Sequence, residues 1–130
     1  MPPRLKKFIF SFLKDRGIDP EDMTVEQLRG DGSSRIFWRI TASVSEPGFI
    51  AMENPPNDDI LRRENFAYLM IGKHLHQKKV PVPGIYTHDL NQGWFIMEDM
   101  GSTSLQDVVS SKKGHLPVYK KLVDHLLGHQ

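Results

Sequence analysis

The sequence predicts an α+β fold in which five strands form one antiparallel sheet with helices packed on one side of it. The order of the elements is the first reason: a helical pattern precedes three strand-like runs, and a second helical pattern separates these from two more. Strands that come in runs, without strict alternation with helices, favour an antiparallel sheet. The short connection Asn91–Gly93 joins the last two runs and predicts a hairpin.

The first half of the chain is expected to hold one helix and three strands. In Arg4–Arg16 apolar residues recur at intervals of three and four, as in an amphipathic helix, and Gly17 follows as its stop. Val25–Arg29 and Arg35–Thr41 are interpreted as strands, the second because Ile36, Trp38 and Ile40 alternate with Arg35, Phe37 and Arg39. The short apolar run Phe49–Met52 is the third strand.

The second half begins with a long helix, predicted over Asp59–Lys78. Asn57 or Asp58 is expected to cap its first turn, and the prolines that follow it end it. One face should be buried, through Leu61, Tyr68, Ile71 and Leu75.

The hairpin strands are expected at Gly84–Thr87 and Trp94–Met97. Helices are predicted at Ser102–Ser110 and Leu116–Leu127, both with apolar faces. These helices suggest a division of the chain into a lobe at 1–101 and the start of a second lobe at 102–130.

Composition narrows the possible functions. With 130 residues the chain is large enough for one core. The 17 basic and 16 acidic residues give a net charge of +1, so neither nucleic acid nor a membrane surface is an expected partner. No apolar run is long enough to span a bilayer, and the absence of cysteine fits a reducing cytoplasm.

Two segments carry the functional prediction. Gly30, Asp31, Gly32, Ser33, Ser34 and Arg35 form a small, flexible turn between two strands, and its backbone could approach phosphates closely. The alternative is an ordinary β-turn without a ligand. The second segment is Trp94–Gly101, an apolar strand that stops at an acidic pair and a glycine, as a buried strand does where it enters a hinge with unused backbone groups.

In order and motifs, the chain from Leu28 to Leu127 resembles the N-terminal lobe of the aminoglycoside phosphotransferase family, which has a protein-kinase-like fold. The likeness is closest to its bacterial kinases of cell-wall amino sugars. The segments that carry the likeness are Gly30–Arg39, Ile50–Pro56, Val80–Tyr86, Asp89–Leu90 and Gly93–Gly101, followed by Leu105.

The resemblance implies transfer of phosphate from ATP, with Mg²⁺, to a hydroxyl of a sugar or aminoglycoside. It implies that the Gly30–Arg35 turn covers the phosphates, and that the backbone of Glu98, Asp99 and Met100 meets the adenine edge with Met97 behind it. In the family, the catalytic and sugar-binding residues belong to the C-terminal lobe. We therefore expect no catalytic residue, no appreciable turnover and no sugar binding in this chain by itself.

One position departs from the usual kinase pattern. Kinases place a phosphate-binding lysine on the third strand, paired with a glutamate of the next helix. Met52 stands in that strand, as is common in the amino-sugar kinases, while Glu64 occupies the helix position on the inward face. Because a buried carboxylate is rarely unpaired, we expect Arg35 or Arg39 to be its partner. A structural ion pair or a solvated helix flank remains the alternative for Glu64.

Other interpretations stay open. Phe95, Met97 and Met100 are each as easily explained by packing in a core as by an adenine pocket. A non-catalytic nucleotide-binding or scaffolding module could bind a partner protein, or another copy of itself, through the C-terminal helices. His125 and His129 have helical spacing that suits a metal, but no third ligand is apparent, so no metal site is expected.

Overall fold

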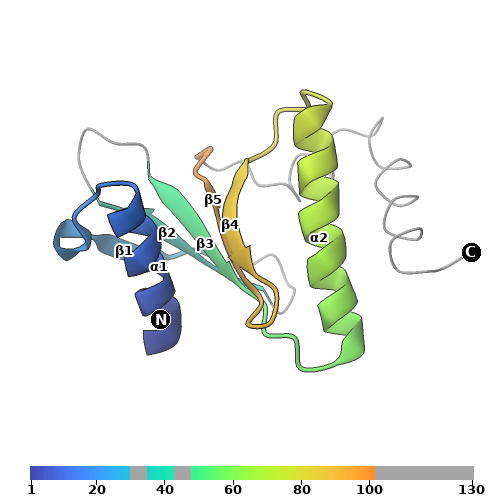
Figure 1. The fold of residues 1–130 in the computed structure, drawn as a ribbon, viewed down its shortest axis with the longest axis horizontal. Helices are drawn as coiled ribbons and strands as arrows, with labels where there is room; N and C mark the ends of the chain where they lie inside the picture. The colour runs from blue at the N-terminus through green and yellow to red at the C-terminus, as the bar shows by residue number, and fades with distance from the viewer. Residues whose placement is uncertain (30–34, 43–47, 102–130) are drawn as a thin grey trace, which may run out of the picture.

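The computed structural model describes residues 1–29, 35–42 and 48–101 of the chain (Figure 1). Two α-helices are present there, α1 (Pro3–Asp15) and α2 (Asp59–Gln77), with a short 3₁₀ helix η1 (Pro20–Asp22) after the first. The strands are β1 (Thr24–Gln27), β2 (Ile36–Thr41), β3 (Phe49–Glu53), β4 (Ile85–Asp89) and β5 (Trp94–Glu98). Every predicted helix and strand in these residues is present, with no end shifted by more than two residues, and only η1 was not predicted.

The five strands form one sheet in the order β1-β2-β3-β5-β4, and every neighbouring pair is antiparallel. The predicted antiparallel sheet is therefore confirmed. As expected, β4 and β5 form a hairpin, with an irregularity in register between Ile85 and Thr87. Gly93 closes its turn with a φ of 74°. A Cβ at Gly93 would collide with the Asn54 carbonyl oxygen, so this position requires glycine for two independent reasons.

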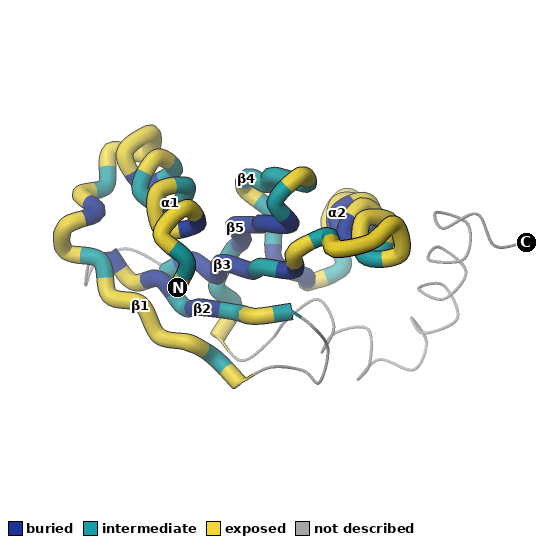
Figure 2. The backbone as a smooth tube through the Cα atoms, turned by 90° about the horizontal axis from the view of Figure 1, so that it is seen from below, coloured by how far each residue is buried: buried dark blue, intermediate teal, exposed yellow. Residues whose placement is uncertain are grey.

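The helix α2 packs on one face of the sheet, as predicted for Asp59–Lys78. The helix α1 covers the opposite face, so the expectation that the helices share one side is wrong. On β3 and β5 consecutive residues point to alternate faces. Ile50, Met52, Phe95 and Met97 belong to the cluster around α2, whereas Phe49, Ala51, Trp94 and Ile96 belong to the cluster around α1. Figure 2 accordingly shows β3 and β5 as largely buried, while the outer surfaces of both helices are exposed.

Hydrogen bonds define the ends of both helices. In α1 the Ile18 N–H donates to Leu13 O at 2.9 Å, and Gly17 has a φ of 74°, which together make a Schellman motif at the predicted glycine stop. The Asp58 carboxylate accepts from Leu61 N at 2.8 Å, so Asp58 is the N-cap of α2.

The C-terminus of α2 repeats the Schellman pattern without a glycine. Val80 N donates to Leu75 O at 3.0 Å, and Lys79 takes the left-handed position with a φ of 61°. Of the four residues expected on the buried face of α2, Tyr68, Ile71 and Leu75 are buried and Leu61 is half-buried.

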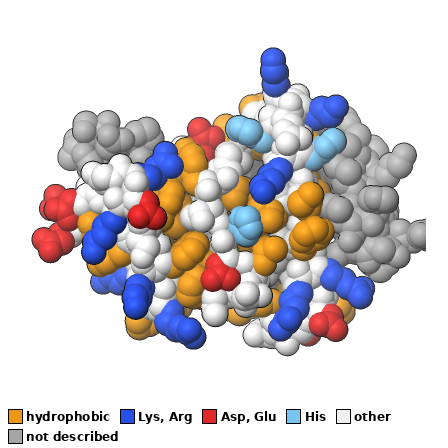
Figure 3. Space-filling view, viewed as in Figure 1, with side chains coloured by type: hydrophobic (Ala, Val, Ile, Leu, Met, Phe, Trp, Pro, Cys, Tyr) orange, Lys and Arg blue, Asp and Glu red, His pale blue; other side chains and the backbone are white. Residues whose placement is uncertain are grey.

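Several predictions fall on residues that the structure does not describe. They include the Gly30–Ser34 part of the glycine- and serine-rich turn, the helices at Ser102–Ser110 and Leu116–Leu127, and the second unit at 102–130. Among the described residues, neither α-helix has the length of apolar sequence that a bilayer crossing requires. Figure 3 shows apolar side chains gathered along the seams between the β4–β5 hairpin and the two helices, with Lys and Arg spread over both helices.

Candidate functional site

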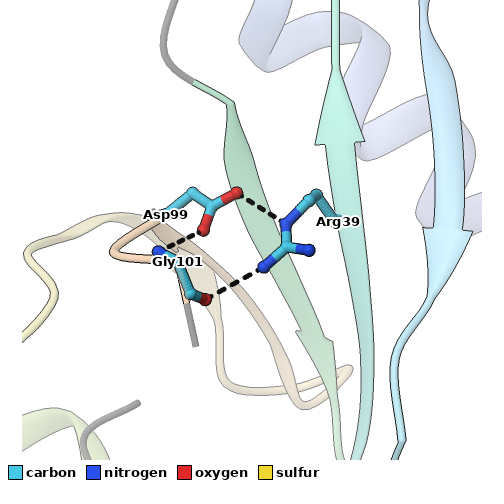
Figure 4. Close-up of polar contacts among 3 residues, drawn as sticks. All are labelled: Arg39, Asp99 and Gly101. Carbon is cyan, nitrogen blue, oxygen red and sulfur yellow. Dashed lines mark hydrogen bonds and ion pairs between the residues drawn. The ribbon is translucent and has the colours of Figure 1, made fainter. Parts of the chain in front are cut away.

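The most specific polar arrangement lies where β5 ends, at residues Glu98–Gly101, here called the hinge segment. Arg39 of β2 reaches this segment across the sheet (Figure 4). Its Nε donates to Asp99 Oδ2 at 2.8 Å, and its Nη2 donates to Gly101 O at 2.9 Å. The side chains of Arg39 and Asp99 are 30% and 12% exposed, so solvent screens this pair only in part. Arg39 therefore ties the hinge segment to a strand sixty residues earlier.

Glycines let the hinge segment adopt this shape. The second carboxylate oxygen of Asp99 accepts from Gly101 N at 2.9 Å, which closes a tight turn. Gly101 has a φ of 75°, a conformation that other residues adopt only with strain. At Gly48, a Cβ would stand 2.8 Å from Ile40 O and 3.4 Å from Asp99 Oδ2, so a larger residue would crowd the carboxylate that binds Arg39.

The side chain of Glu98 is engaged with the neighbouring hairpin strand. The backbone N–H of Glu98 donates to Gly84 O at 2.8 Å, and the side-chain Oε1 accepts from Gly84 N at 3.2 Å. An open pocket of about 430 Å³ adjoins this contact, lined in part by His76 and Tyr86. Glu98 thus belongs to the predicted site through its backbone, while its carboxylate helps to hold β4.

The sheet face that packs on α2, here called the α2 face, carries two cross-strand rows of side chains. In the row nearest the hinge segment, Arg39 lies opposite Ile50, and Ile50 lies opposite Met97. In the next row, Phe37 lies opposite Met52, which lies opposite Phe95. Leu28 extends the second row, because its N–H donates to Phe37 O at 2.8 Å.

The rows are apolar at the β1–β2 end as well. Leu28 and Phe37 pack against the same cluster as Ile50 and Met97, but both are only half-buried. This leaves a partly open apolar surface beside the hinge segment. Such a surface, next to backbone donors and acceptors, suits a flat heterocycle with polar edges.

Tyr68 of α2 joins the apolar rows to the start of β2. Its hydroxyl contacts Met97 Sδ at 3.8 Å, and its ring meets the Phe95 ring edge-on at a centroid distance of 5.6 Å. The Arg35 guanidinium carbon lies 5.5 Å from the centre of the Tyr68 ring. Arg35 and Met97, which the sequence placed in one site, therefore both contact Tyr68.

The expected partnership between Glu64 and an arginine is wrong. Arg39 pairs with Asp99, Arg35 lies over the Tyr68 ring, and no ion pair joins Glu64 to either arginine within the described residues. Glu64 itself is half-buried. The alternative of a helix flank in contact with solvent fits this environment better.

A buried pair of amides links β3 to α2 instead. Asn54 Nδ2 donates to Asn65 Oδ1 at 2.9 Å, and Asn65 Nδ2 donates to Asn54 O at 2.8 Å. Both residues are 1% exposed. Asn54 N donates to Gly93 O at 2.8 Å, so the same link reaches the hairpin turn. Neutral hydrogen bonds fasten the helix here, which removes the need for a buried charge.

No cluster of three or more His, Asp or Glu side chains suitable for a metal occurs in the part of the chain that the structure describes. Asp99, the acidic residue of the hinge segment nearest β2, is bound by Arg39. Within the described residues, the Asp99 carboxylate is thus engaged by an arginine and is not grouped with other metal-ligating side chains.

No protein-family profile matches the chain, and no curated protein resembles it closely enough to indicate a relative. The resemblance to phosphotransferases therefore stays a prediction.

Of the predicted site residues, the structure describes Arg35, Glu64, Met97, Glu98, Asp99 and Met100, whereas Gly30, Asp31, Gly32, Ser33 and Ser34 lie outside the described ranges. The sequence reasoning missed Leu28, Phe37 and Ile50. The alternation of side chains in β2, together with the register of β3, could have placed the last two beside Met97.

Proposed function

We propose that this chain binds ATP between the hinge segment and the β1–β2 end of the α2 face. In this proposal it is the nucleotide-binding lobe of a phosphotransferase that transfers phosphate to a hydroxyl of a sugar or aminoglycoside. The observation that carries the proposal is the partly open apolar surface of Leu28 and Phe37, which continues from the buried Ile50 and Met97. It lies beside a hinge segment fixed by Arg39.

The apolar surface suits the faces of adenine, and the backbone of the hinge segment suits its edge. Adenine is flat and apolar on its faces, so it gains from contact with half-buried aliphatic and aromatic side chains. Its edge needs a donor and an acceptor, which the backbone at Glu98–Met100 would supply once β5 has ended. The Arg39–Asp99 contact keeps that backbone in one arrangement, which lowers the entropy lost on binding.

The remaining parts of the proposal rest on the resemblance. The sugar or aminoglycoside would be bound together with a C-terminal lobe, Mg²⁺ would accompany the ATP, and the protein would work in the cytoplasm. The alternative function, a scaffolding module, concerns helices outside the described residues. Only nucleotide binding can be tested directly on the described surface.

The test is a titration of the ¹⁵N-labelled chain with ATP, followed by amide chemical shifts. With one side of the base in contact with solvent, we expect a dissociation constant on the order of 1 mM, about −4 kcal/mol. The largest shifts should fall together on Leu28, Phe37 and the hinge segment. Shifts confined to another surface would reject the site.

Two variants of one strand region sharpen the test. Leu28→Glu places a charge on the proposed adenine surface and should weaken binding about tenfold, because a carboxylate there must lose water or repel the nucleotide. Val25→Glu is the matched control: Val25 pairs with Ile40 on the other face and is 40% exposed. Equal binding by both variants would contradict the proposed location.

A further inference from the structure

We propose that the free edge of β4 binds an extended, acidic peptide of a partner protein, which joins the sheet as an additional strand. The strand order is β1-β2-β3-β5-β4, so within the described residues the sheet ends at β4 and no strand pairs with its outer side. Figure 2 shows β4 at this margin, between α1 and α2. This surface differs from the proposed ATP site, and peptide binding there does not depend on the nucleotide.

The backbone of β4 offers hydrogen-bonding groups at this edge. In an antiparallel pair, residues that exchange hydrogen bonds alternate with residues whose backbone groups point away from the partner strand. Glu98 N donates to Gly84 O at 2.8 Å, so this pair is of the first kind. Counting back along β5 from Glu98, the first and third residues are of the second kind, and they face Ile85 and His88. The N–H and C=O groups of Ile85 and His88 therefore point to the free edge, where an added strand would bond to them.

A groove runs along each side of the edge. The α2 groove is the pocket of about 430 Å³ that Lys73 and His76 of α2 line together with Tyr86. The α1 groove is a hollow of about 310 Å³ that Phe8 and Phe12 of α1 line, again with Tyr86. Tyr86 is 43% exposed, so the edge between the grooves is open to solvent. Because side chains alternate along a strand, an added strand would send every second side chain into each groove.

The α1 groove suits apolar side chains. The Tyr86 ring lies 6.0 Å from the Phe12 ring and 5.6 Å from the Phe49 ring, measured between centroids. Farther along the hairpin, a second hollow of about 380 Å³ is lined by Phe8 and Trp94, whose rings lie 5.4 Å apart. Figure 3 shows this aromatic surface as part of the apolar seam between the hairpin and α1. An apolar side chain placed there would leave water without giving up a hydrogen bond.

The α2 groove suits a carboxylate. Lys73 is exposed and brings an ammonium group to it, and His76 adds an imidazole. The acidic residue of this groove, Glu98, already accepts a hydrogen bond from Gly84 N at 3.2 Å. An acidic side chain of the added strand would therefore meet a cation whose charge is not paired with Glu98 by any ion pair among the described residues.

Charge on the two helices favours the same kind of ligand. From Arg4 to Arg16 there are five basic residues and one acidic residue, Asp15, and from Asn65 to Lys79 there are three lysines and no acidic residue. Both walls of the edge are therefore basic, although the whole chain has a net charge of only +1. Such walls attract an acidic peptide and repel a basic one. A segment in which acidic and apolar residues alternate matches both grooves.

The shape of the edge favours a single peptide over the sheet of a second copy. The register between β4 and β5 is irregular between Ile85 and Thr87, which makes the edge uneven. An uneven edge is a poor template for a flat strand that is already fixed in another sheet, whereas a flexible peptide follows it. A single strand also fits between α1 and α2 more easily than a sheet that carries its own helices.

The test uses a synthetic peptide of about eight residues, with blocked ends, in which glutamate alternates with phenylalanine or valine. It is titrated into the ¹⁵N-labelled full chain, and amide chemical shifts and hydrogen exchange are measured. We expect the exchange of the Ile85 and His88 amides to slow at least about tenfold at saturating peptide, because these amides gain hydrogen bonds. The chemical shifts should change along β4 and beside Lys73 and Phe12.

Modified peptides and two variants separate strand addition from attraction between charges. The same peptide with a fully N-methylated backbone donates no backbone hydrogen bond, so it should bind at least about tenfold more weakly. Lys73→Glu should weaken binding of the unmodified peptide about tenfold. Lys6→Glu is the matched control, because Lys6 is an exposed residue of α1 whose ammonium lies 5.6 Å from the centre of the Phe10 ring, and it lines neither groove. Its effect should stay within about twofold.

Three results would overturn the proposal. Unchanged exchange at Ile85 and His88 in saturating peptide would exclude strand addition, and this measurement needs no variant to fold. Equal binding of the N-methylated peptide would show that charge alone attracts the ligand. Slow exchange of the two amides without peptide, if it depends on protein concentration, would show that a second copy of the chain occupies the edge instead.

Discussion

Replacing Arg39 with glutamine should loosen the hinge segment by an amount that the geometry allows us to estimate. The substitution removes a 2.8 Å contact to Asp99 and a 2.9 Å contact to Gly101 O. Exposed ion pairs contribute up to about 1 kcal/mol, while breaking a fully buried pair costs about 3–5 kcal/mol. With side chains 30% and 12% exposed, this pair is intermediate. We expect Arg39→Gln to lower the free energy of unfolding by about 2 kcal/mol.

A double-mutant cycle isolates the pair from the rest of this loss. Urea unfolding of the parent, Arg39→Gln, Asp99→Asn and the double variant can be followed by tryptophan fluorescence, because Trp38 and Trp94 are 5% and 7% exposed. The coupling energy should be about 1 kcal/mol, and it should fall only slightly in high salt.

A control cycle measures the coupling of Arg39 to Glu26 instead of Asp99. Glu26 is the residue directly opposite Arg39 on β1. Glu26 is exposed, so its coupling to Arg39 should be less than half as large. A coupling between Arg39 and Asp99 of less than about 0.3 kcal/mol, or one no larger than that of the Glu26 cycle, would refute the reasoning.

Three further predictions concern stability. Gly93→Ala should lower the free energy of unfolding in urea by at least about 3 kcal/mol, because steric overlap adds to backbone strain. Gly17 has the same φ, but no atom lies within 4 Å of the added Cβ, so Gly17→Ala should cost only about 1 kcal/mol. Equal losses in the two variants would contradict this reasoning. Lys79→Gly should raise the free energy of unfolding by about 0.5–1 kcal/mol by relieving a φ of 61°, and a loss of stability would show that the lysine side chain matters. At His88, burial and then the Lys73 ammonium lower the pKa below 6.5, so the unfolded chain binds a proton first. The free energy of unfolding should therefore fall as pH drops below 6.5, and it should fall less in His88→Gln. If the free energy of unfolding depends equally on pH in both proteins, His88 is not the source of the loss.

Local patterns in the sequence determined which elements form and where they end. Gly17 ends α1 because the Schellman motif there requires a left-handed residue, which glycine adopts without strain, and Asp58 caps α2 because its carboxylate reaches the first turn. The hairpin follows from a short loop ending in Gly93. These effects act within a few residues, so they can be read from one stretch of chain.

The tertiary structure decided which face each helix covers and which charges meet. Alternation in β2 shows that Trp38 and Phe37 point to opposite faces, but it does not say which face receives α2. The sequence offered Arg39 only as a partner of Glu64, whereas the register of β2, β3 and β5 brings Asp99 within its reach.

The link between β3 and α2 could not be predicted for the same reason. Asn54 and Asn65 are polar residues that a sequence pattern places at a strand end and on a helix, where they usually meet water. They are buried because each supplies the hydrogen bonds that the other requires. Such pairing is a property of two side chains brought together by packing, so the sequence by itself determined the elements, and only the tertiary structure determined the contacts that join them.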